Sequence, residues 1–240
     1  MIKHSLHSLV RAARRHLGLE QGMPDGLKPW DRDFLRWIAE AEATGKDPND
    51  IGDSAWSGSR LEVTERHYLP YITADSVVLE LGPGTGRVTR YVIGRCREMI
   101  LVDYSPVVCE WLPKYLTGKG RFRVHRIAGP AFPDVDSASV DVAIANGVFH
   151  HIDTYATYFF LEEFYRVLRP GGVVSFDFVQ LVSAEGREFF KQWRPAPGSE
   201  SIFRFHHPDV IGTLAELAGF EVIALTSSTS RLAFLEARKR

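Results

Sequence analysis

The sequence predicts an α/β protein: a doubly wound, mostly parallel seven-stranded sheet with a C-terminal antiparallel hairpin and an N-terminal helical extension. Three observations carry this prediction. From residue 76 onward, short apolar runs typical of strands alternate with amphipathic helical stretches. A glycine-rich turn at residues 82–86 follows the first apolar run. The last two apolar runs are joined by four Ser and Thr residues, 227–230, which indicates a hairpin.

The composition is that of a globular protein with a full core. Of the 240 residues, 45% are hydrophobic and 25% are charged, and the formal net charge of -1 gives no global field that would favour nucleic acid. Cys96 and Cys109 indicate neither a disulfide framework nor a zinc site. No apolar stretch approaches the ~20 residues that span a membrane and no signal peptide is apparent, so we expect a cytoplasmic protein.

The chain is expected to form one domain with an addition. We expect residues 75–240 to be the main domain and residues 1–74 to be a helical extension that serves as a lid. Residues 1–17 place apolar side chains at helical spacing opposite a basic face. Such a helix either packs on the domain or on a partner subunit, or makes weak contact with an anionic membrane surface.

Capping residues, glycine stops and apolar periodicity predict the other elements. Residues 18–30 are rich in Gly and Pro and indicate a linker, after which Asp31 is predicted to cap a helix that ends near Ala43. The polar segment 45–58 is predicted to form turns. The helices expected after it are 59–71, 86–95, 106–116, 154–168, 183–193 and 208–218. The strands expected are 76–81, 98–102, 121–127, 140–145, 172–179, 220–226 and 231–236.

The glycine turn is the most informative motif. It follows an apolar strand, and Asp103 ends the next strand 17 residues after its last glycine. Glycines let the backbone approach a nucleotide-type cofactor closely, and a carboxylate can hold a ribose diol. A dinucleotide fingerprint would need a third glycine at position 87, where this chain has Arg87, whereas Glu80 lies two residues before the first glycine.

With these features the chain resembles the class I S-adenosylmethionine-dependent methyltransferases, which have a Rossmann-like fold. The resemblance covers roughly residues 60–235 and rests on five features in this order: Glu80 to Gly86; Asp103; residues 141–151; residues 163–172; and residues 218–222. A glycine loop alone would be weak evidence, whereas the five together are specific. The resemblance implies S-adenosylmethionine as the cofactor.

The resemblance also implies which residues hold that cofactor. Glu80 is expected near its methionine part, Asp103 at both ribose hydroxyls and Tyr104 against adenine. The loop after the third strand lacks the acid usual in the family, so adenine is expected to contact the backbone of Ala128 and Gly129. The remaining expected cofactor residues are Gly82, Gly84, Gly86 and Asn146.

Acceptor and base candidates lie on loops expected at the carboxyl ends of the strands. His151 and His150 are candidates for a general base, with His151 preferred because Asp153 could orient its ring. His206 and His207 are further candidates, and each histidine could instead pack or cap. The expected acceptor contacts are Trp56, Trp193 and Arg204.

We therefore expect methyl transfer to an oxygen or nitrogen of a small-molecule acceptor, such as a sugar or a secondary metabolite. The alternatives are a lipid-linked or membrane-adjacent acceptor, suggested by residues 1–17, and a non-catalytic cofactor-binding protein. A nucleic-acid acceptor is disfavoured by the charge and by the run Asn146-Gly147-Val148-Phe149. The nine histidines lack the spacing of metal ligands, so no metal is expected.

Overall fold

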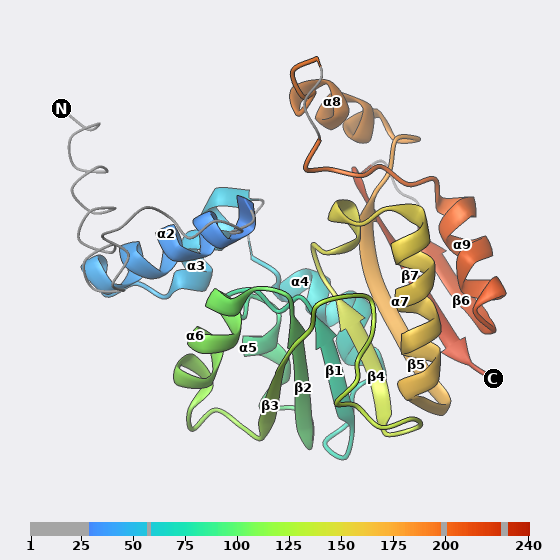
Figure 1. Ribbon diagram of the computed structural model, residues 1–240, viewed down its shortest axis with the longest axis horizontal. Helices are drawn as coiled ribbons and strands as arrows, with labels where there is room; N and C mark the ends of the chain where they lie inside the picture. The colour runs from blue at the N-terminus through green and yellow to red at the C-terminus, as the bar shows by residue number, and fades with distance from the viewer. Residues whose placement is uncertain (1–28, 57–58, 198–200, 227–229) are drawn as a thin grey trace.

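The computed structural model describes residues 29–56, 59–197, 201–226 and 230–240, whose strands form one twisted sheet (Figure 1). The strand order is β3-β2-β1-β4-β5-β7-β6, with the first five strands parallel and β7 antiparallel to both β5 and β6. The strands are β1 (Val77–Leu81), β2 (Glu98–Asp103), β3 (Phe122–Arg126), β4 (Val140–Ala145), β5 (Leu168–Val179), β6 (Phe220–Thr226) and β7 (Leu232–Lys239). The predicted fold class is confirmed. The expected basic helix at 1–17 lies outside the described residues.

The order of the strands reverses beside β1. Strands β2 and β3 extend the sheet from one side of β1, and β4 extends it from the other. Leu81 is level with Val102 of β2 and with Ala145 of β4, so the residues that follow these three strands meet at one edge. In open parallel sheets such a switch point is where ligands bind.

Successive side chains along the strands point alternately into two hydrophobic cores, one on each face of the sheet. Leu79 and Leu81 of β1 face a core that includes Phe160 and Phe164 of α7 (Thr154–Val167). Val78 faces the opposite core. The other helices packed on the sheet are α5 (Thr89–Val92), α6 (Pro106–Leu116) and α9 (Pro208–Leu217). Strands that are apolar on both faces need helices packed on both faces of the sheet.

The extension contains more helix than the sequence predicted. The segment 45–58, predicted as turns, holds helix α3 (Pro48–Trp56). The Asp47 carboxylate accepts from the Asn49 backbone N–H at 2.8 Å and Pro48 takes the first position, so a cap starts this helix. Helix α2 (Pro29–Thr44) begins before Asp31, and its predicted capping role is wrong. The expected helix at 59–71 is α4 (Leu61–Val63), the π-helical η1 (Thr64–Tyr68) and the 3₁₀ turn η2 (Leu69–Tyr71).

Two further boundaries differ from prediction. The helix expected from residue 86 begins at Thr89, because Gly86 has φ +97° and cannot take helical geometry there. Strand β5 begins at Leu168 instead of residue 172, since Leu168 already pairs with Val140 ahead of an irregularity in the register. Both differences lie at turns that glycines shape.

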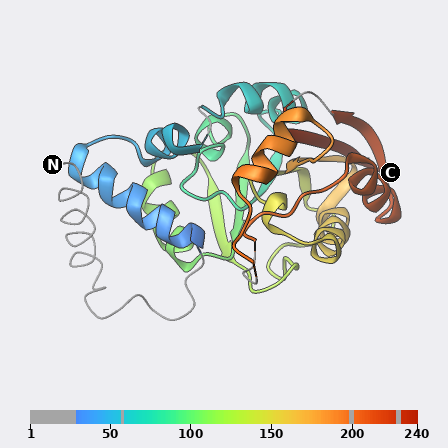
Figure 2. The ribbon, with the colours of Figure 1, turned by 90° about the horizontal axis from the view of Figure 1, so that it is seen from above.

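Two segments lie beyond the carboxyl ends of the strands. Helices α2 and α3 lie over the β1–β2–β3 side, and α8 (Ala184–Gln192) lies over the other side (Figures 1 and 2). None of the described helices is long and apolar enough to cross a bilayer. The site is therefore bounded by the sheet edge and by these two covers.

The α7 aromatic cluster gives a stability test. Phe164 is fully buried and packs with Phe132, Phe149 and Phe160, whereas Phe159 on the same helix is 46% exposed. Phe164→Ala is expected to lower the free energy of unfolding by about 3–5 kcal/mol through the cavity it leaves. Phe159→Ala, the matched control, should change it by about 1 kcal/mol or less. Urea unfolding followed by circular dichroism measures both, and equal effects would contradict this packing.

Candidate functional site

A cavity of about 1190 Å³ lies at the switch point of the sheet. Many predicted site residues line it: Glu80, Gly82, Gly84, Asp103, Tyr104, Ala128, Asn146, His150, His151 and Arg204. Five others are not among its lining residues: Gly86, Gly129, Trp193, His206 and His207. Trp56 ends helix α3, and its side chain lies outside the described part of the chain.

The glycine turn forms the floor beside β1. Gly82 has φ +67°, and a Cβ there would meet Val148 Cγ2 at 2.4 Å. Gly84 has φ +54°, and its Cβ would lie 3.1 Å from the Phe34 ring of α2. Both positions therefore require glycine on conformational and steric grounds. The buried Thr85 hydroxyl on this turn has no hydrogen-bond partner among the described residues.

Asp103 ends β2 with its carboxylate directed at backbone donors. It accepts from the Ser105 N–H at 2.8 Å and from the Gly84 N–H at 3.4 Å. Burial raises the pKa of Asp103 to about 6, even though these two N–H groups act in the opposite direction. The carboxylate keeps acceptor capacity for further donors in the cavity.

Glu80 is the second buried carboxyl group of this region. It is 2% exposed and accepts from the Thr89 hydroxyl at 2.7 Å. Burial raises the pKa of Glu80 to about 8, with the nearby Asp103 charge adding to the effect and the Thr89 bond opposing it. Neither Glu80 nor Asp103 forms an ion pair within the described chain, so both would gain from a cationic or hydrogen-bond-donating ligand.

Helix α2 contributes residues that the sequence did not assign to the site. Asp31 is 2% exposed and accepts a hydrogen bond from the Ser105 hydroxyl, which also caps α6. Trp30, Phe34 and Trp37 line the cavity as well. The only sequence signal was an apolar stripe on this helix, which predicts packing but not a partner.

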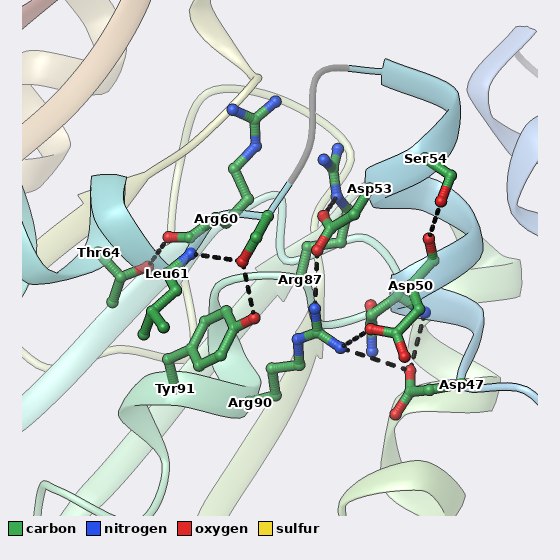
Figure 3. A network of polar contacts seen from close by, with 12 residues as sticks. Asp47, Asp50, Asp53, Ser54, Arg60, Leu61, Thr64, Arg87, Arg90 and Tyr91 are labelled. Atoms are coloured by element: carbon green, nitrogen blue, oxygen red, sulfur yellow. Dashed lines mark hydrogen bonds and ion pairs between the residues drawn. The ribbon is translucent and has the colours of Figure 1, made fainter.

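The α2–α3 cover is bound to the glycine turn by ion pairs (Figure 3). Asp53 of α3 accepts from Arg87 at 2.6 Å and from Arg90 at 2.7 Å, and Asp50 accepts from Arg90 at 2.7 Å. Asp53 and both arginines are at most 16% exposed. Arg87, which occupies the place of the missing dinucleotide glycine, therefore anchors the cover.

The His151 ring is held by a backbone carbonyl. Its Nδ1 lies 2.6 Å from the Ile202 carbonyl oxygen, and its ring stacks on Phe203 with centroids 5.4 Å apart. When Nδ1–H donates to that carbonyl, Nε2 remains as an acceptor. The prediction that Asp153 orients this ring is wrong, because Asp153 caps α7 by accepting from the Ala156 N–H. Burial lowers the pKa of His151, which keeps the ring neutral near pH 7.

His150 lies beside His151, with ring centroids 4.3 Å apart. Its Nδ1 is buried and has no hydrogen-bond partner among the described residues. Burial holds the pKa of His150 well below its usual range, and the Arg60 and Arg231 guanidinium groups, together with the His151 ring when it is protonated, add to the effect. His150 is thus a second neutral imidazole at the cavity.

The other two histidines have structural contacts. His206 is 5% exposed, and its Nε2 lies 3.0 Å from the Phe149 carbonyl oxygen and 3.1 Å from that of Ile152. His207 caps α9 by accepting from the Asp209 N–H at 3.2 Å. Both contacts place these rings away from the cavity, in the packing and capping positions that were the alternative to a catalytic role.

The remaining part of the cavity lies beyond β4, β5 and β7. Asp177 of β5 is 1% exposed and accepts from the Gly147 N–H at 2.7 Å. Arg60 and Arg231 line the same region. The sequence analysis missed these three residues, although an acid between Phe176 and Phe178 in a buried strand was a usable signal. Trp193 packs behind the wall, 5.2 Å from the Phe203 ring.

Three comparisons agree with this geometry. Residues 79–176 match the family model described as a methyltransferase domain. A probable S-adenosylmethionine-dependent methyltransferase of Mycolicibacterium smegmatis is 34% identical over 146 residues, which are 60% of this chain and 52% of that protein. The chain thus spans about half the length of this relative.

Solved structures share the fold. A possible histamine N-methyltransferase of Thermotoga maritima has a TM-score of 0.61 at 20% identity, covering 88% of this chain and 100% of that one. The [4+2]-cyclase SpnF has a TM-score of 0.58 at 18% identity, covering 74% and 78%. At these identities the likeness concerns the fold alone. The glycine turn and the two buried carboxylates lie inside the segment that matches the methyltransferase domain, and together with the similarity to the Mycolicibacterium smegmatis relative they support S-adenosylmethionine as the cofactor.

Proposed function

We propose that the protein transfers a methyl group from S-adenosylmethionine to an oxygen or nitrogen of a small-molecule acceptor, of the sugar or secondary-metabolite type. The observation that carries the proposal is one cavity that joins the glycine turn and Asp103 to a second region around His150, His151 and Asp177. A cofactor at the first region leaves the second for an acceptor. Both covers contribute lining residues, which suits a small acceptor better than a broad flat partner.

The residues present fit this cofactor. Asp103 has acceptor capacity for ribose hydroxyls, and the buried Glu80 would gain a favourable partner in an ammonium group. The Thr85 hydroxyl, which has no hydrogen-bond partner in the described part of the chain, lies on the same turn. When bound, S-adenosylmethionine supplies a methyl group already activated on a sulfonium.

The chain's own residues would then align the acceptor and remove its proton. Alignment alone can contribute about 7–11 kcal/mol to a bimolecular reaction. A hydroxyl acceptor also needs a base, and His151 is neutral, oriented and next to the cavity. The Trp30 ring of α2, 5.5 Å from the His151 ring, helps to keep water away from it.

The first test is direct transfer. The full chain is incubated with S-adenosylmethionine carrying a labelled methyl group and with metabolite extracts of its own organism, and products are identified by mass spectrometry. We expect a labelled product of low molecular mass. Tight binding of S-adenosylhomocysteine without transfer to any pool would instead support a non-catalytic binding protein.

From the raised pKa of Glu80 we predict that cofactor binding releases a proton. Its pKa of about 8 leaves it mostly protonated at pH 7 in the free protein. An ammonium beside it favours the carboxylate, so S-adenosylhomocysteine should displace most of one proton. Calorimetry in phosphate and in Tris measures this as a difference in binding enthalpy. Glu80→Gln should remove the difference and the exposed control Glu62→Gln should keep it; equal enthalpies for wild type refute the assignment.

If His151 is the general base, we predict that replacing it lowers the rate of methyl transfer without weakening cofactor binding. His151→Gln is expected to lower kcat by about 10²–10⁴-fold, the contribution of a positioned base, with the Kd of S-adenosylhomocysteine retained. His207→Gln, which alters the cap of α9 away from the cavity, serves as the control. Because the pKa of His151 is lowered from 6.5, kcat should fall only at pH values below 6.5. If His151→Gln and His150→Gln both keep the wild-type rate, catalysis proceeds by alignment without a histidine base.

A further inference from the structure

Apolar side chains form one wall of the cavity next to the His150–His151 pair. Six residues make up this apolar wall: Trp30, Val179, Phe189, Ile202, Phe203 and Leu232. They come from α2, β5, α8, the loop before α9 and β7, so the sheet and both covers contribute to it. A pocket lined in this way favours a ligand with a large apolar body and few polar groups.

Aromatic rings follow one another along this wall. The His151 ring contacts the rings of Trp30 and Phe203, with centroids 5.5 Å and 5.4 Å away. Phe203 in turn packs edge to face on Phe189 at 5.0 Å. Aromatic rings pack favourably on other rings, offset or edge to face, beyond the apolar area that they bury. The wall therefore favours a planar aromatic body next to His151.

The arginines that line the same part of the cavity already interact with other groups of the protein. Arg204 donates to the Ser201 carbonyl at 2.6 Å. The Arg231 guanidinium lies 3.4 Å from the Glu185 carboxylate. Arg60 likewise interacts with another group. Because these charges are engaged within the protein, the region does not require a charged acceptor.

The strength of the base limits which hydroxyl group it can serve. Burial lowers the pKa of His151, so its neutral ring is a weaker base than a histidine in water. A phenolic hydroxyl has a pKa of about 10, whereas an alkyl hydroxyl resembles water, whose pKa is about 15.7. Proton transfer to a weak base is therefore far less unfavourable from a phenol than from a sugar hydroxyl.

We propose that the acceptor is a neutral aromatic compound whose phenolic hydroxyl is methylated, with its ring against Phe189 and Phe203 and its hydroxyl toward His151. The acceptor oxygen forms the bond to the methyl carbon while the carbon–sulfur bond breaks and leaves its electron pair on sulfur. The hydroxyl proton goes to Nε2 of His151, and the products are an aryl methyl ether and S-adenosylhomocysteine. This inference rests on the proposed function, because it names the acceptor class of the same site.

A matched pair of probes tests the apolar wall without requiring the true acceptor. The full chain saturated with S-adenosylhomocysteine is titrated with 2-naphthol and with decahydro-2-naphthol, which share one carbon skeleton and one hydroxyl but differ in aromaticity. We expect 2-naphthol to bind about fivefold or more tightly, because ring contacts add to the burial of apolar area. Equal binding of the two, or no binding of either at millimolar concentration, overturns the proposal.

Two neighbouring phenylalanines of α8 provide a variant and its matched control. Phe189 is 8% exposed and lines the cavity, whereas Phe190 is 48% exposed and is not among the described lining residues. Phe189→Leu keeps an apolar side chain but removes the ring, so it should weaken 2-naphthol binding about two- to tenfold while the Kd of S-adenosylhomocysteine is kept. Phe190→Leu should change neither affinity.

Phe203→Leu is the second variant, and it keeps the test decisive if Phe189→Leu fails to fold. It removes the ring that contacts both Phe189 and His151, so the same two- to tenfold loss is expected. An affinity for 2-naphthol that is unchanged in the folded variants contradicts the assignment of the aromatic wall to the acceptor.

Fractionating the transfer assay separates this inference from the proposed function. The metabolite extract is split between ethyl acetate and water at neutral pH, where phenols are uncharged and sugars stay in water, before each part is incubated with labelled S-adenosylmethionine. We expect the label in the ethyl acetate part, in products that mass spectrometry and NMR identify as aryl methyl ethers. Label only in the aqueous part, or on nitrogen, overturns the phenolic acceptor while preserving methyl transfer. No label in either part overturns methyl transfer itself.

Discussion

The burial of two carboxyl groups at the ends of adjacent parallel strands is the constraint on which the site depends. Glu80 and Asp103 are brought together because β1 and β2 pair in register up to Leu81 and Val102. No side-chain cation pairs with either among the residues described, and burial raises the pKa of each. Such an arrangement is unfavourable for the free protein. It becomes favourable when a ligand brings positive charge and hydroxyl donors to the same place.

The glycine turn can serve this arrangement only because other elements hold it. Three of the five residues of this turn are glycines, which have no side chains to make contacts of their own. Arg87 and Arg90 extend from the turn and from α5 to the acids of α3 (Figure 3). The Phe34 ring lies against Gly84. Asp53 binds both arginines and is largely buried with them, so it is the residue of α3 on which this attachment most depends. The cover and the turn therefore behave as one unit.

The sequence predicted the features that are encoded locally. The glycine turn, the carboxylate that ends β2 and the strand alternation depend on neighbouring residues, so pattern and spacing were sufficient. The late start of α5 depends on the backbone conformation of Gly86, and the true partner of His151 is a carbonyl about 50 positions away. The position of Asp31 against Ser105 likewise joins segments 74 residues apart. Single-sequence patterns carry no information about such contacts.

The extension is attached to the domain at a second place besides the α3 ion pairs. The two attachments together hold Arg60 in position. Beyond the α3 network, His67 of η1 donates to Glu236 of β7 at 2.9 Å and stacks on Phe234. Tyr68 donates to the Ala145 carbonyl at the end of β4. Arg60 lies between these two anchors.

Local bonds hold Arg60 in that place. Its carbonyl accepts from both the N–H and the hydroxyl of Thr64 at the start of the π-helical turn η1, at 2.9 Å and 2.6 Å. A rigid swing of the whole extension would break either the arginine–aspartate network or the Glu236 contacts. The extension is therefore better understood as a permanent wall of the cavity than as a swinging lid. Its arginine is built into the site by the same contacts that hold the chain on the sheet.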